Sequence, residues 1–548
     1  MLQKQLTASV ILQSGRLKLS TNNKKLTGAA IIVMTALVVS RITGFLRTIL
    51  INNLLTASQS DALVAAFKST DLMYNLLVGG AISAALIPIL SGYLAKDEEE
   101  DGWKAVGTFI NVIFVAMIIL CILGVVFAPS VVSFTAKGYT GEKRELTIQL
   151  TRILFPSVGF MMLAGLTNGV LNSYQRFAAA AYGPSIYNLG VALSIFVLSR
   201  FGVKYVAYGI LSSAVIYFII QISFALPNFK YYKFKILWKH SGFRRLFKIA
   251  IPSLAASAII QVNVLISQNF ISIFKLDGSL TAYGNANDLW QLPYGVFAMG
   301  LGTALLPTLS EKLALKKLDE FKEIINSAFK TILYLIIPSA VAFVVLSGPL
   351  VSVVYKWSQL IGVERISTAG TILAMFTIAM IAQSMLAILT RAFYANNDTK
   401  TPLYIGIVSM VLNYVFCTIF LSYTDLGPAG MSLSYSLISV IYMIIMMFIL
   451  SKKMNGMQWK KLLKYSVKIF VAAAIMGIVL FCANRIIPIN FSQTFSIHSK
   501  LLEILALGIE IIVGALIYFG CTMLLKVNEA IEFRNKTFGK LNRLLKRT

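Results

Sequence analysis

The sequence predicts an all-α polytopic membrane protein, and three observations lead to this fold class. Of the 548 residues, 57% are hydrophobic and only 13% are charged, and the mean hydropathy is +0.77. A soluble globular protein is nearer half apolar, with about a quarter of its residues charged. The apolar residues fall in runs of about twenty or more, the length that a helix needs to cross a bilayer. Basic residues gather in alternate loops, as they do on the cytoplasmic side of membrane proteins.

About fourteen apolar runs are long enough to be membrane-spanning helices. They cover residues 28–51, 61–94, 105–128, 146–173, 181–199, 204–227, 248–273, 281–310, 326–354, 367–393, 402–422, 428–451, 465–484 and 501–525. Several are longer than a bilayer requires, which allows them to tilt or to extend beyond the membrane.

The loops between these runs predict the orientation of the chain. With the first segment inside, inner segments hold roughly thirty-three basic residues and outer segments roughly ten. We therefore expect both termini in the cytoplasm, with residues 1–27 as a tail, because they lack a signal peptide's apolar region and cleavage site. The net charge of +27 then reflects the membrane topology and attracts anionic membrane lipids. We therefore expect no nucleic-acid partner.

An internal repeat divides most of the runs into two lobes. Residues 79–94 resemble residues 300–313, and the sequence around Tyr174 resembles that around Tyr394, both at an offset of about 220 residues. Six spans is an even number, so the two copies share one orientation. Parallel repeats of this kind are a known transporter plan, with substrate handled between the halves.

The expected organisation is two pseudo-symmetric six-helix lobes with additional segments around them. We expect a cytoplasmic tail at 1–27, an N-lobe at 28–228, a linker at 229–247, a C-lobe at 248–451, two further spans within 452–525 and a basic cytoplasmic tail at 526–548. The linker interleaves basic and aromatic residues, and we predict an amphipathic helix lying on the membrane surface.

Two arginines lie inside the first apolar run. An ionised side chain at bilayer depth costs a few kcal/mol or more unless it faces protein or water. On a helix, Arg41 and Arg47 flank Gly44 and differ in depth by roughly 9 Å. We predict that both side chains face a water-filled cavity, where they can bind an anion. The alternative is that each pairs with a local carboxylate or extends to the membrane surface.

The second run also holds charged residues. Asp61 lies near its outer edge, and Lys68 and Asp71 lie deeper. Lys68 and Asp71 are three residues apart on a helix, so they can either neutralise one another or line the cavity.

Polar residues recur in the eighth run and after the tenth. In the eighth run, Asp288 could pair with an arginine across the cavity or carry a proton or cation; its polar neighbours are Asn285, Asn287 and Gln291. Arg391 ends the tenth run. Asp398 follows, and it either caps the next helix or belongs to a cation site.

Signatures of enzymes and of metal sites are absent from the sequence. The four cysteines lie in apolar runs without metal or disulfide spacing, and two scattered histidines are too few for a metal site or a catalytic network. No phosphate-binding loop, HExxH or GxSxG motif occurs. We therefore expect a transporter without a cofactor, not an enzyme.

Several motifs resemble those of MurJ-type lipid II flippases. SRITGFLRT (40–48) is similar to the family's first-helix motif, and residues 60–94 are similar to its second helix. LWQLPYGVFAMGLGTALLPTLSE (289–311) and RAFYANNDTKTP (391–402) resemble its eighth-helix and tenth-loop motifs. The resemblance implies the fold of the multidrug/oligosaccharidyl-lipid/polysaccharide exporter superfamily, with two extra helices that shape a lipid-tail groove. It also implies that Arg41, Gly44, Arg47, Asp61 and Lys68 belong to the substrate cavity.

The chain departs from the family pattern at five positions. Where the family has charged residues, this chain has Thr48, Tyr74, Gly79, Asp288 and Gln291. Asp288 replaces a cationic residue and Tyr74 replaces an arginine. The cavity is thus expected to be less positive than in the family pattern, with Tyr74 among its secondary candidates.

The leading hypothesis is a flippase for undecaprenyl-pyrophosphate-linked peptidoglycan precursor (lipid II), working by alternating access in the bacterial cytoplasmic membrane. Its expected partners are this lipid-linked saccharide, anionic lipids and the cell-wall synthesis machinery, and we expect a monomer. The membrane potential or a sodium or proton gradient is the expected energy source. The alternatives are a flippase for another lipid-linked oligosaccharide, such as a capsule unit, and a drug/cation antiporter; deep arginines argue against the antiporter because they repel cations.

Overall fold

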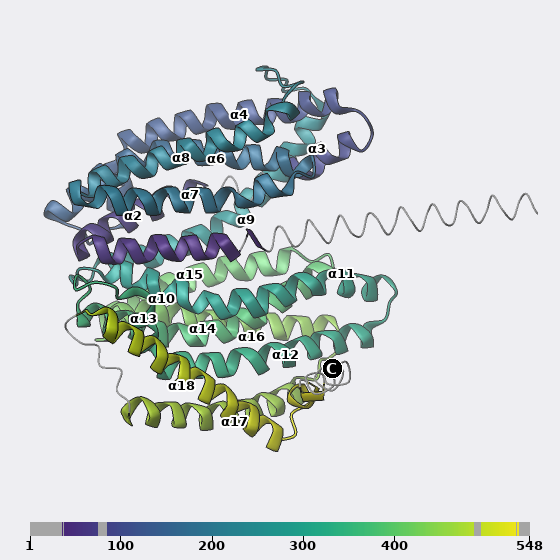
Figure 1. Ribbon diagram of the computed structural model, residues 1–548. Helices are drawn as coiled ribbons and strands as arrows, with labels where there is room; N and C mark the ends of the chain where they lie inside the picture. The colour runs from purple at the N-terminus through teal and green to yellow at the C-terminus, as the bar shows by residue number, and fades with distance from the viewer. Residues whose placement is uncertain (1–34, 37, 75–84, 487–494, 533, 536–548) are drawn as a thin grey trace, which may run out of the picture. The chain divides into compact units, whose positions relative to one another are not determined.

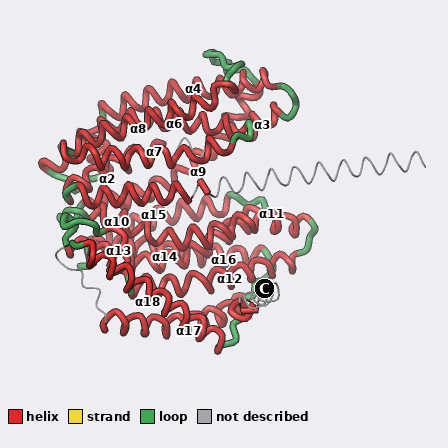
Figure 2. Tube along the Cα trace, in the orientation of Figure 1, coloured by secondary structure: helices red, strands yellow, loops and turns green. Residues whose placement is uncertain are grey.

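The structure is a computed structural model that describes residues 35–36, 38–74, 85–486, 495–532 and 534–535. Within these residues every regular element is a helix, and no strand occurs (Figure 2). Gly79, the whole predicted N-terminal tail (1–27) and residues 536–548 of the C-terminal tail lie outside the described residues. The all-α prediction is confirmed.

Two compact units make up the chain. Unit 1 comprises residues 1–54, 66–132 and 144–261, and unit 2 comprises residues 55–65, 133–143 and 262–548. α2 (Ala57–Tyr74), α5 (Ala128–Thr135), α6 (Gly141–Ser173) and α9 (Ser241–Ser272) each contribute residues to both units.

Unit 1 contains the helices of the N-terminal part of the chain. A helix covers residues 38–54. The helices labelled in Figure 1 are α2 (Ala57–Tyr74), α3 (Ile87–Leu94), α4 (Glu99–Val126), α6 (Gly141–Ser173), α7 (Phe177–Leu198), α8 (Val203–Ala225) and α9 (Ser241–Ser272), and the short α5 (Ala128–Thr135) lies between α4 and α6. α6 is one of the two most buried candidate spans among the described helices, with 67% of its apolar window buried.

Unit 2 is built around α14 (Val363–Ala395), whose central window is also 67% buried. α14 packs against α10 (Ser279–Pro293), α12 (Leu318–Val345) and α16 (Pro428–Lys453), as Figure 1 shows. The remaining helices are α11 (Gly300–Ala314), α13 (Ser347–Tyr355), α15 (Lys400–Tyr423), α17 (Trp459–Ile486) and α18 (Ile497–Leu524). A π-helical turn, η4 (Tyr294–Met299), joins α10 to α11 without a loop.

Eleven helices among the described residues are long and apolar enough to cross a membrane. The other three predicted runs fall on the helix at 38–54, on α2 with α3, and on α9, all of which are helical where described. The chain is therefore a multi-pass membrane protein.

The element order repeats along the chain. In unit 1, the long helix α4 is followed at once by the short α5 and then by the buried α6. In unit 2, α12, α13 and α14 follow in the same order, about 220 residues later. The duplication read from two short sequence matches thus extends to whole helices.

The linker prediction was wrong for residues 229–240, which form no α-helix; α9 begins at Ser241. The backbone of this segment forms only isolated turns of its own and also bonds to side chains of α4. Asn111 Nδ2 donates to the carbonyls of Lys233 (3.2 Å) and Lys235 (2.9 Å). The Thr108 hydroxyl accepts the N–H of Leu237.

The aromatic residues of the linker also have packing partners. Phe229 and Tyr232 lie against Trp103 of α4, with ring centroids 4.9 and 6.2 Å away. The interleaved pattern that predicted a surface helix therefore reflects, at these positions, side chains that pack against α4.

Candidate functional site

A polar cluster in unit 1 contains the deep arginine of the first span. Arg47 lies on the helix at 38–54, and its guanidinium stacks over the Phe67 ring at 5.6 Å from the centroid. Its Nε is buried and has no hydrogen-bond acceptor among the described residues. Since a buried donor without a partner is costly, this nitrogen is suited to an acceptor that arrives from outside.

Three further predicted residues lie with Arg47. Lys68 and Arg47 both exert their charge on the Asp71 carboxylate. The hydroxyls of Tyr74 and Tyr187 lie within electrostatic range of the same carboxylate. Helix 38–54 and α2 thus bring together four predicted residues, with two cations and one carboxylate among them. The net charge of these groups is positive.

Sequence reasoning missed the residues from other helices that complete the cluster. Tyr187 of α7 packs on Tyr217 of α8, with ring centroids 6.3 Å apart. The Tyr217 hydroxyl accepts a hydrogen bond from Asn168 Nδ2 of α6 at 2.8 Å. A lone tyrosine in an apolar run resembles any buried aromatic residue, so no local signal marked these positions.

Arg41 and Gly44 lie on the same helix but play different parts. The Arg41 side chain is exposed. Gly44 faces α7: a Cβ added there would lie 3.6 Å from Asn188 Nδ2, which donates to the Ser40 carbonyl. This is an ordinary contact distance, so Gly44 borders α7 without being required by it.

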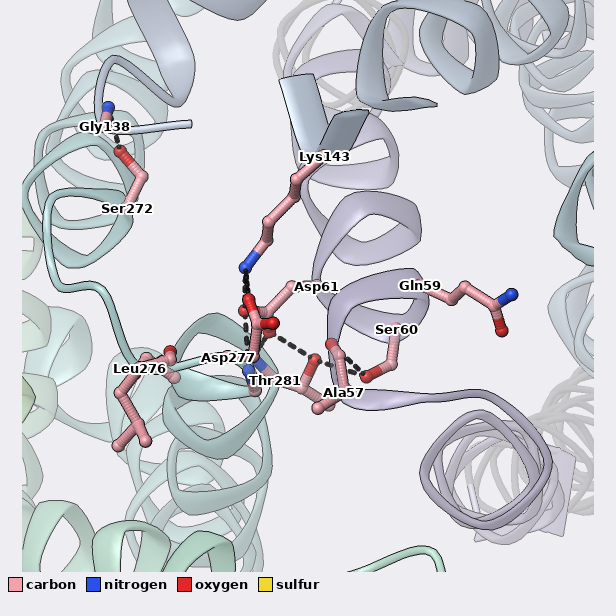
Figure 3. Close-up of polar contacts among 12 residues, drawn as sticks. Ala57, Gln59, Ser60, Asp61, Gly138, Lys143, Ser272, Leu276, Asp277 and Thr281 are labelled. Atoms are coloured by element: carbon pink, nitrogen blue, oxygen red, sulfur yellow. Dashed lines mark hydrogen bonds and ion pairs between the residues drawn. The ribbon is translucent and has the colours of Figure 1, made fainter. Parts of the chain in front are cut away.

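Asp61 is placed differently, in a buried cluster of unit 2. It is 1% exposed, and its carboxylate accepts four hydrogen bonds. The donors are Lys143 Nζ (2.9 Å), the Gly278 N–H (2.9 Å), and the N–H and hydroxyl of Thr281 (2.9 and 2.8 Å). Lys143 also binds Asp277 Oδ1 at 2.8 Å, so it bridges two carboxylates (Figure 3).

This saturated arrangement ties the start of α2 to the start of α10. The carboxylate lies at the N-terminus of α10, where backbone N–H groups and the helix dipole favour a negative charge. Because its acceptor sites are occupied, Asp61 is suited to holding these helices together, whereas its predicted role was substrate contact.

Arg365 and Gly278 complete the Asp61 cluster. Arg365 is 7% exposed, and its Nη2 donates to the Ser60 hydroxyl at 3.1 Å. Gly278 has φ of +89°, and a Cβ there would lie 3.0 Å from Arg365 Cδ. Both the backbone conformation and the close arginine therefore require glycine at this position.

A cavity of about 250 Å³ opens in unit 2 beside the π-helical turn η4. Its polar lining comes from α14, from η4 and from α16, and it includes the predicted residue Arg391. The lining residues are Tyr294, Met299, Gly302, Gln383, Leu386, Ala387, Thr390, Arg391, Tyr394 and Tyr442.

Polar groups in this cavity are held in place by the surrounding helices. Gln383 Nε2 donates to the Tyr435 hydroxyl (3.1 Å) and to the Ser439 hydroxyl (3.0 Å). The Tyr442 hydroxyl donates to the Pro402 carbonyl at 2.9 Å. A cation, fixed hydroxyl groups and aromatic rings together suit the binding of a polar, anionic headgroup.

The predicted residues of the eighth span lie on α10. Asn287 Oδ1 accepts the indole N–H of Trp290 at 3.1 Å. Asp288 is half-buried and exerts its charge on Tyr355, whose hydroxyl donates to the Asn285 carbonyl. Gln291 is half-buried. None of these four residues of α10 lines the cavity beside η4.

Asp398 caps a helix, which is one of its two predicted roles. Its carboxylate accepts the N–H of Thr401 (3.0 Å) and the Thr401 hydroxyl (2.6 Å) and forms an ion pair with Lys453. Burial opposes ionisation, but the hydrogen bonds from Lys453 and Thr401 outweigh it and lower the pKa of Asp398 to about 2. In the described residues, no group of three or more metal-ligating side chains occurs.

Comparisons with known proteins agree with the motifs. Residues 51–502 match a family model described as lipid II flippase MurJ. The chain is 28% identical over 501 residues to the lipid II flippase MurJ of Burkholderia cenocepacia, an alignment that covers 88% of this chain and 94% of the relative.

Two solved structures have a similar fold. A lipid II flippase MurJ in an inward closed conformation matches with a TM-score of 0.75 and 24% identity, over 90% of this chain and 98% of that chain. An inward-facing multidrug resistance transporter of the MATE family, from the MOP superfamily, matches with a TM-score of 0.68 and 15% identity, over 78% of this chain and 98% of that chain.

Proposed function

Because the chain belongs to the MurJ family of lipid II flippases, we propose that it moves lipid II from the inner to the outer leaflet of the bacterial cytoplasmic membrane. This activity supplies precursor for peptidoglycan synthesis on the outer surface. We also propose that both termini lie in the cytoplasm, and that the chain delivers its substrate to the wall-synthesis machinery as a monomer.

The observation that carries this proposal is the environment of Arg47. Its buried Nε has no acceptor among the described residues, and Lys68 adds a second cation beside Asp71. A pyrophosphate cannot cross hydrocarbon unaided, because burying its charges without partners is prohibitive. A guanidinium can replace water around it through paired, charge-assisted hydrogen bonds.

The Arg391 cavity of unit 2 supports the same substrate class. It offers one cation, an amide and tyrosine hydroxyls, and sugars and phosphates bind such groups. Net movement requires two conformations that bind the headgroup with different affinity. We propose that the membrane potential or a gradient of sodium or protons biases them.

The experiment is complementation with matched arginine variants. A strain depleted of its lipid II flippase receives this chain or its Arg47→Ala, Arg47→Lys or Arg152→Ala variant. Arg152 is an exposed arginine of the same unit and serves as the control. We expect growth with the parent and Arg152→Ala, loss of growth with Arg47→Ala, and partial rescue with Arg47→Lys, which keeps the charge but not the paired donors.

Failure of the membrane-inserted parent to sustain growth would overturn the lipid II assignment. If Arg47→Ala supports growth as well as Arg152→Ala, the role of Arg47 is wrong while the assignment stands.

A second candidate, a flippase for another lipid-linked oligosaccharide, is favoured by the composition of the unit 1 cluster. Tyr74 supplies a hydroxyl near Asp71 where the family pattern has an arginine. The Thr48 hydroxyl donates to the Gly44 carbonyl where the pattern has an aspartate. Headgroup competition in proteoliposomes distinguishes the two: lipid II should compete better than a pyrophosphate-linked capsule unit if the first proposal holds.

A further inference from the structure

A buried glutamate in the last span has no partner in the described structure. Glu510 lies near the centre of α18, a helix of 28 residues, about 20 Å from each end at 1.5 Å per residue. It is 4% exposed, and neither carboxyl oxygen has a hydrogen-bond donor within the described part of the chain.

A second buried glutamate on the same helix provides the contrast. Glu503, 9% exposed, accepts hydrogen bonds from Lys500 Nζ (3.1 Å) and from the Ser352 hydroxyl (3.4 Å). Lys500 also donates to the Ser352 carbonyl at 2.7 Å. The outer carboxylate of α18 is therefore neutralised by a cation, and the central one is not.

Among the described residues, no charged side chain of the helices packed against α18 hydrogen-bonds to the Glu510 carboxyl or acts on it electrostatically. On α17, Leu480 lies against Gly514, one helical turn from Glu510. The ionisable groups of the outer half of α17 are Cys482 and Arg485, both exposed, and Arg485 stacks on the Phe481 ring.

The neighbouring helices α12 and α13 contribute tyrosines, and the buried Lys356 that follows α13 lies near Lys500, at the outer end of α18. The carbonyl of Tyr334, on α12, accepts the Tyr518 hydroxyl of α18, and their rings lie 5.4 Å apart. The Tyr355 hydroxyl, on α13, donates to the Asn285 carbonyl. An ionised carboxylate at Glu510 would thus lack water and would have no counter-ion among the described residues, at a cost of several kcal/mol.

We propose that Glu510 is a proton-binding site: the buried carboxyl carries a proton, and the proton is released to water when a conformational change hydrates this face of α18. The ligand is the proton itself, and the step is a carboxylic acid ionising to a carboxylate. The site does not depend on the proposed function, but its use as an energy source for flipping rests on it.

The first test is labelling with dicyclohexylcarbodiimide, an apolar reagent that adds to protonated carboxyls without a leaving group. The purified full chain in proteoliposomes is labelled at about pH 6 and about pH 9, and modified peptides are measured by mass spectrometry. We expect Glu510 to be labelled at least fivefold more at pH 6 than at pH 9. Glu503, a buried glutamate of the same helix that is paired with Lys500, is the internal control and should stay unlabelled.

The Glu510→Gln variant serves as the negative control for peptide assignment, and Glu510→Asp should keep the label. Absence of label on Glu510 at pH 6, labelling no greater than at Glu503, or equal labelling at both pH values would each overturn the proposal.

The second test asks whether the proton is used. Translocation of lipid II by proteoliposomes is measured with and without a pH gradient, for the parent and Glu510→Gln. We expect the gradient to change the parent's rate severalfold and to leave the variant's rate unchanged. An equal response of both would remove the coupling role. A parent that is labelled as expected but does not translocate lipid II would refute the proposed function and leave the proton site standing.

Discussion

Replacing Asp61 with asparagine should strongly destabilise unit 2. The carboxylate is 1% exposed and accepts four hydrogen bonds of 2.8–2.9 Å. Asparagine has the same shape, but one of its oxygens becomes an amide that donates hydrogen bonds. That amide would face Lys143 or a backbone N–H of Gly278 or Thr281, all of which are donors. At least one buried donor is therefore left without an acceptor, and Lys143 loses its buried counter-charge.

The size of the effect follows from the burial of this pair. Breaking a buried ion pair by removing one partner costs about 3–5 kcal/mol. Unfolding entropy is about 2.1 cal/mol/K per residue, and unit 2 has roughly 300 residues. The expected fall in Tm is therefore on the order of 5–8 °C.

Thermal unfolding of the purified chain, followed by tryptophan fluorescence, measures the fall in Tm. The matched control is Asp277→Asn, because Asp277 binds the same Lys143 at 2.8 Å but its side chain is 56% exposed. Exposed pairs contribute about 0–1 kcal/mol, so its Tm should change by less than about 2 °C. Equal shifts in the two variants would refute the argument from burial.

Two further changes test other parts of the structure. Gly278→Ala should lower the free energy of unfolding by roughly 1–3 kcal/mol, because φ is +89° and the new Cβ would lie 3.0 Å from Arg365 Cδ. The control is Gly284→Ala, where the new Cβ has open space around it. The Tm values of the two variants are compared. The pKa of Asp398 is lowered to about 2, so the stabilisation from its contacts is present above about pH 4 and lost as the pH falls through about 2. Asp398→Asn should therefore reduce Tm at pH 7, and the difference from the parent should vanish near pH 2.

The fold could be predicted largely from the sequence because membrane spans are long, local and strongly apolar. The linker at 229–240 was mispredicted for a physical reason. Its basic and aromatic residues suit a surface helix, yet its backbone bonds to side chains of Thr108 and Asn111 on α4. A hydrogen bond from a residue more than 120 positions away leaves no trace in the local pattern.

The candidate site shows the same limit. Arg47, Lys68, Asp71 and Tyr74 come together because they lie on consecutive spans, where helical spacing is readable from the sequence. Asp61 could not be assigned in this way, since its partners lie far along the chain: Lys143 is 82 residues away and Thr281 is 220 residues away.

The π-helical turn at Tyr294–Met299 has a consequence for the helix that contains it. A π turn accommodates one extra residue, and one residue corresponds to a rotation of about 100° around an α-helix axis. α10 and α11 both pack against α14. In a continuous α-helix, the face that α11 turns to α14 would be rotated by about 100° from its present position, and the π turn supplies this rotation. Deleting one residue within 294–299 would restore regular winding and turn the α11 side of the cavity, including Gly302, away from Arg391.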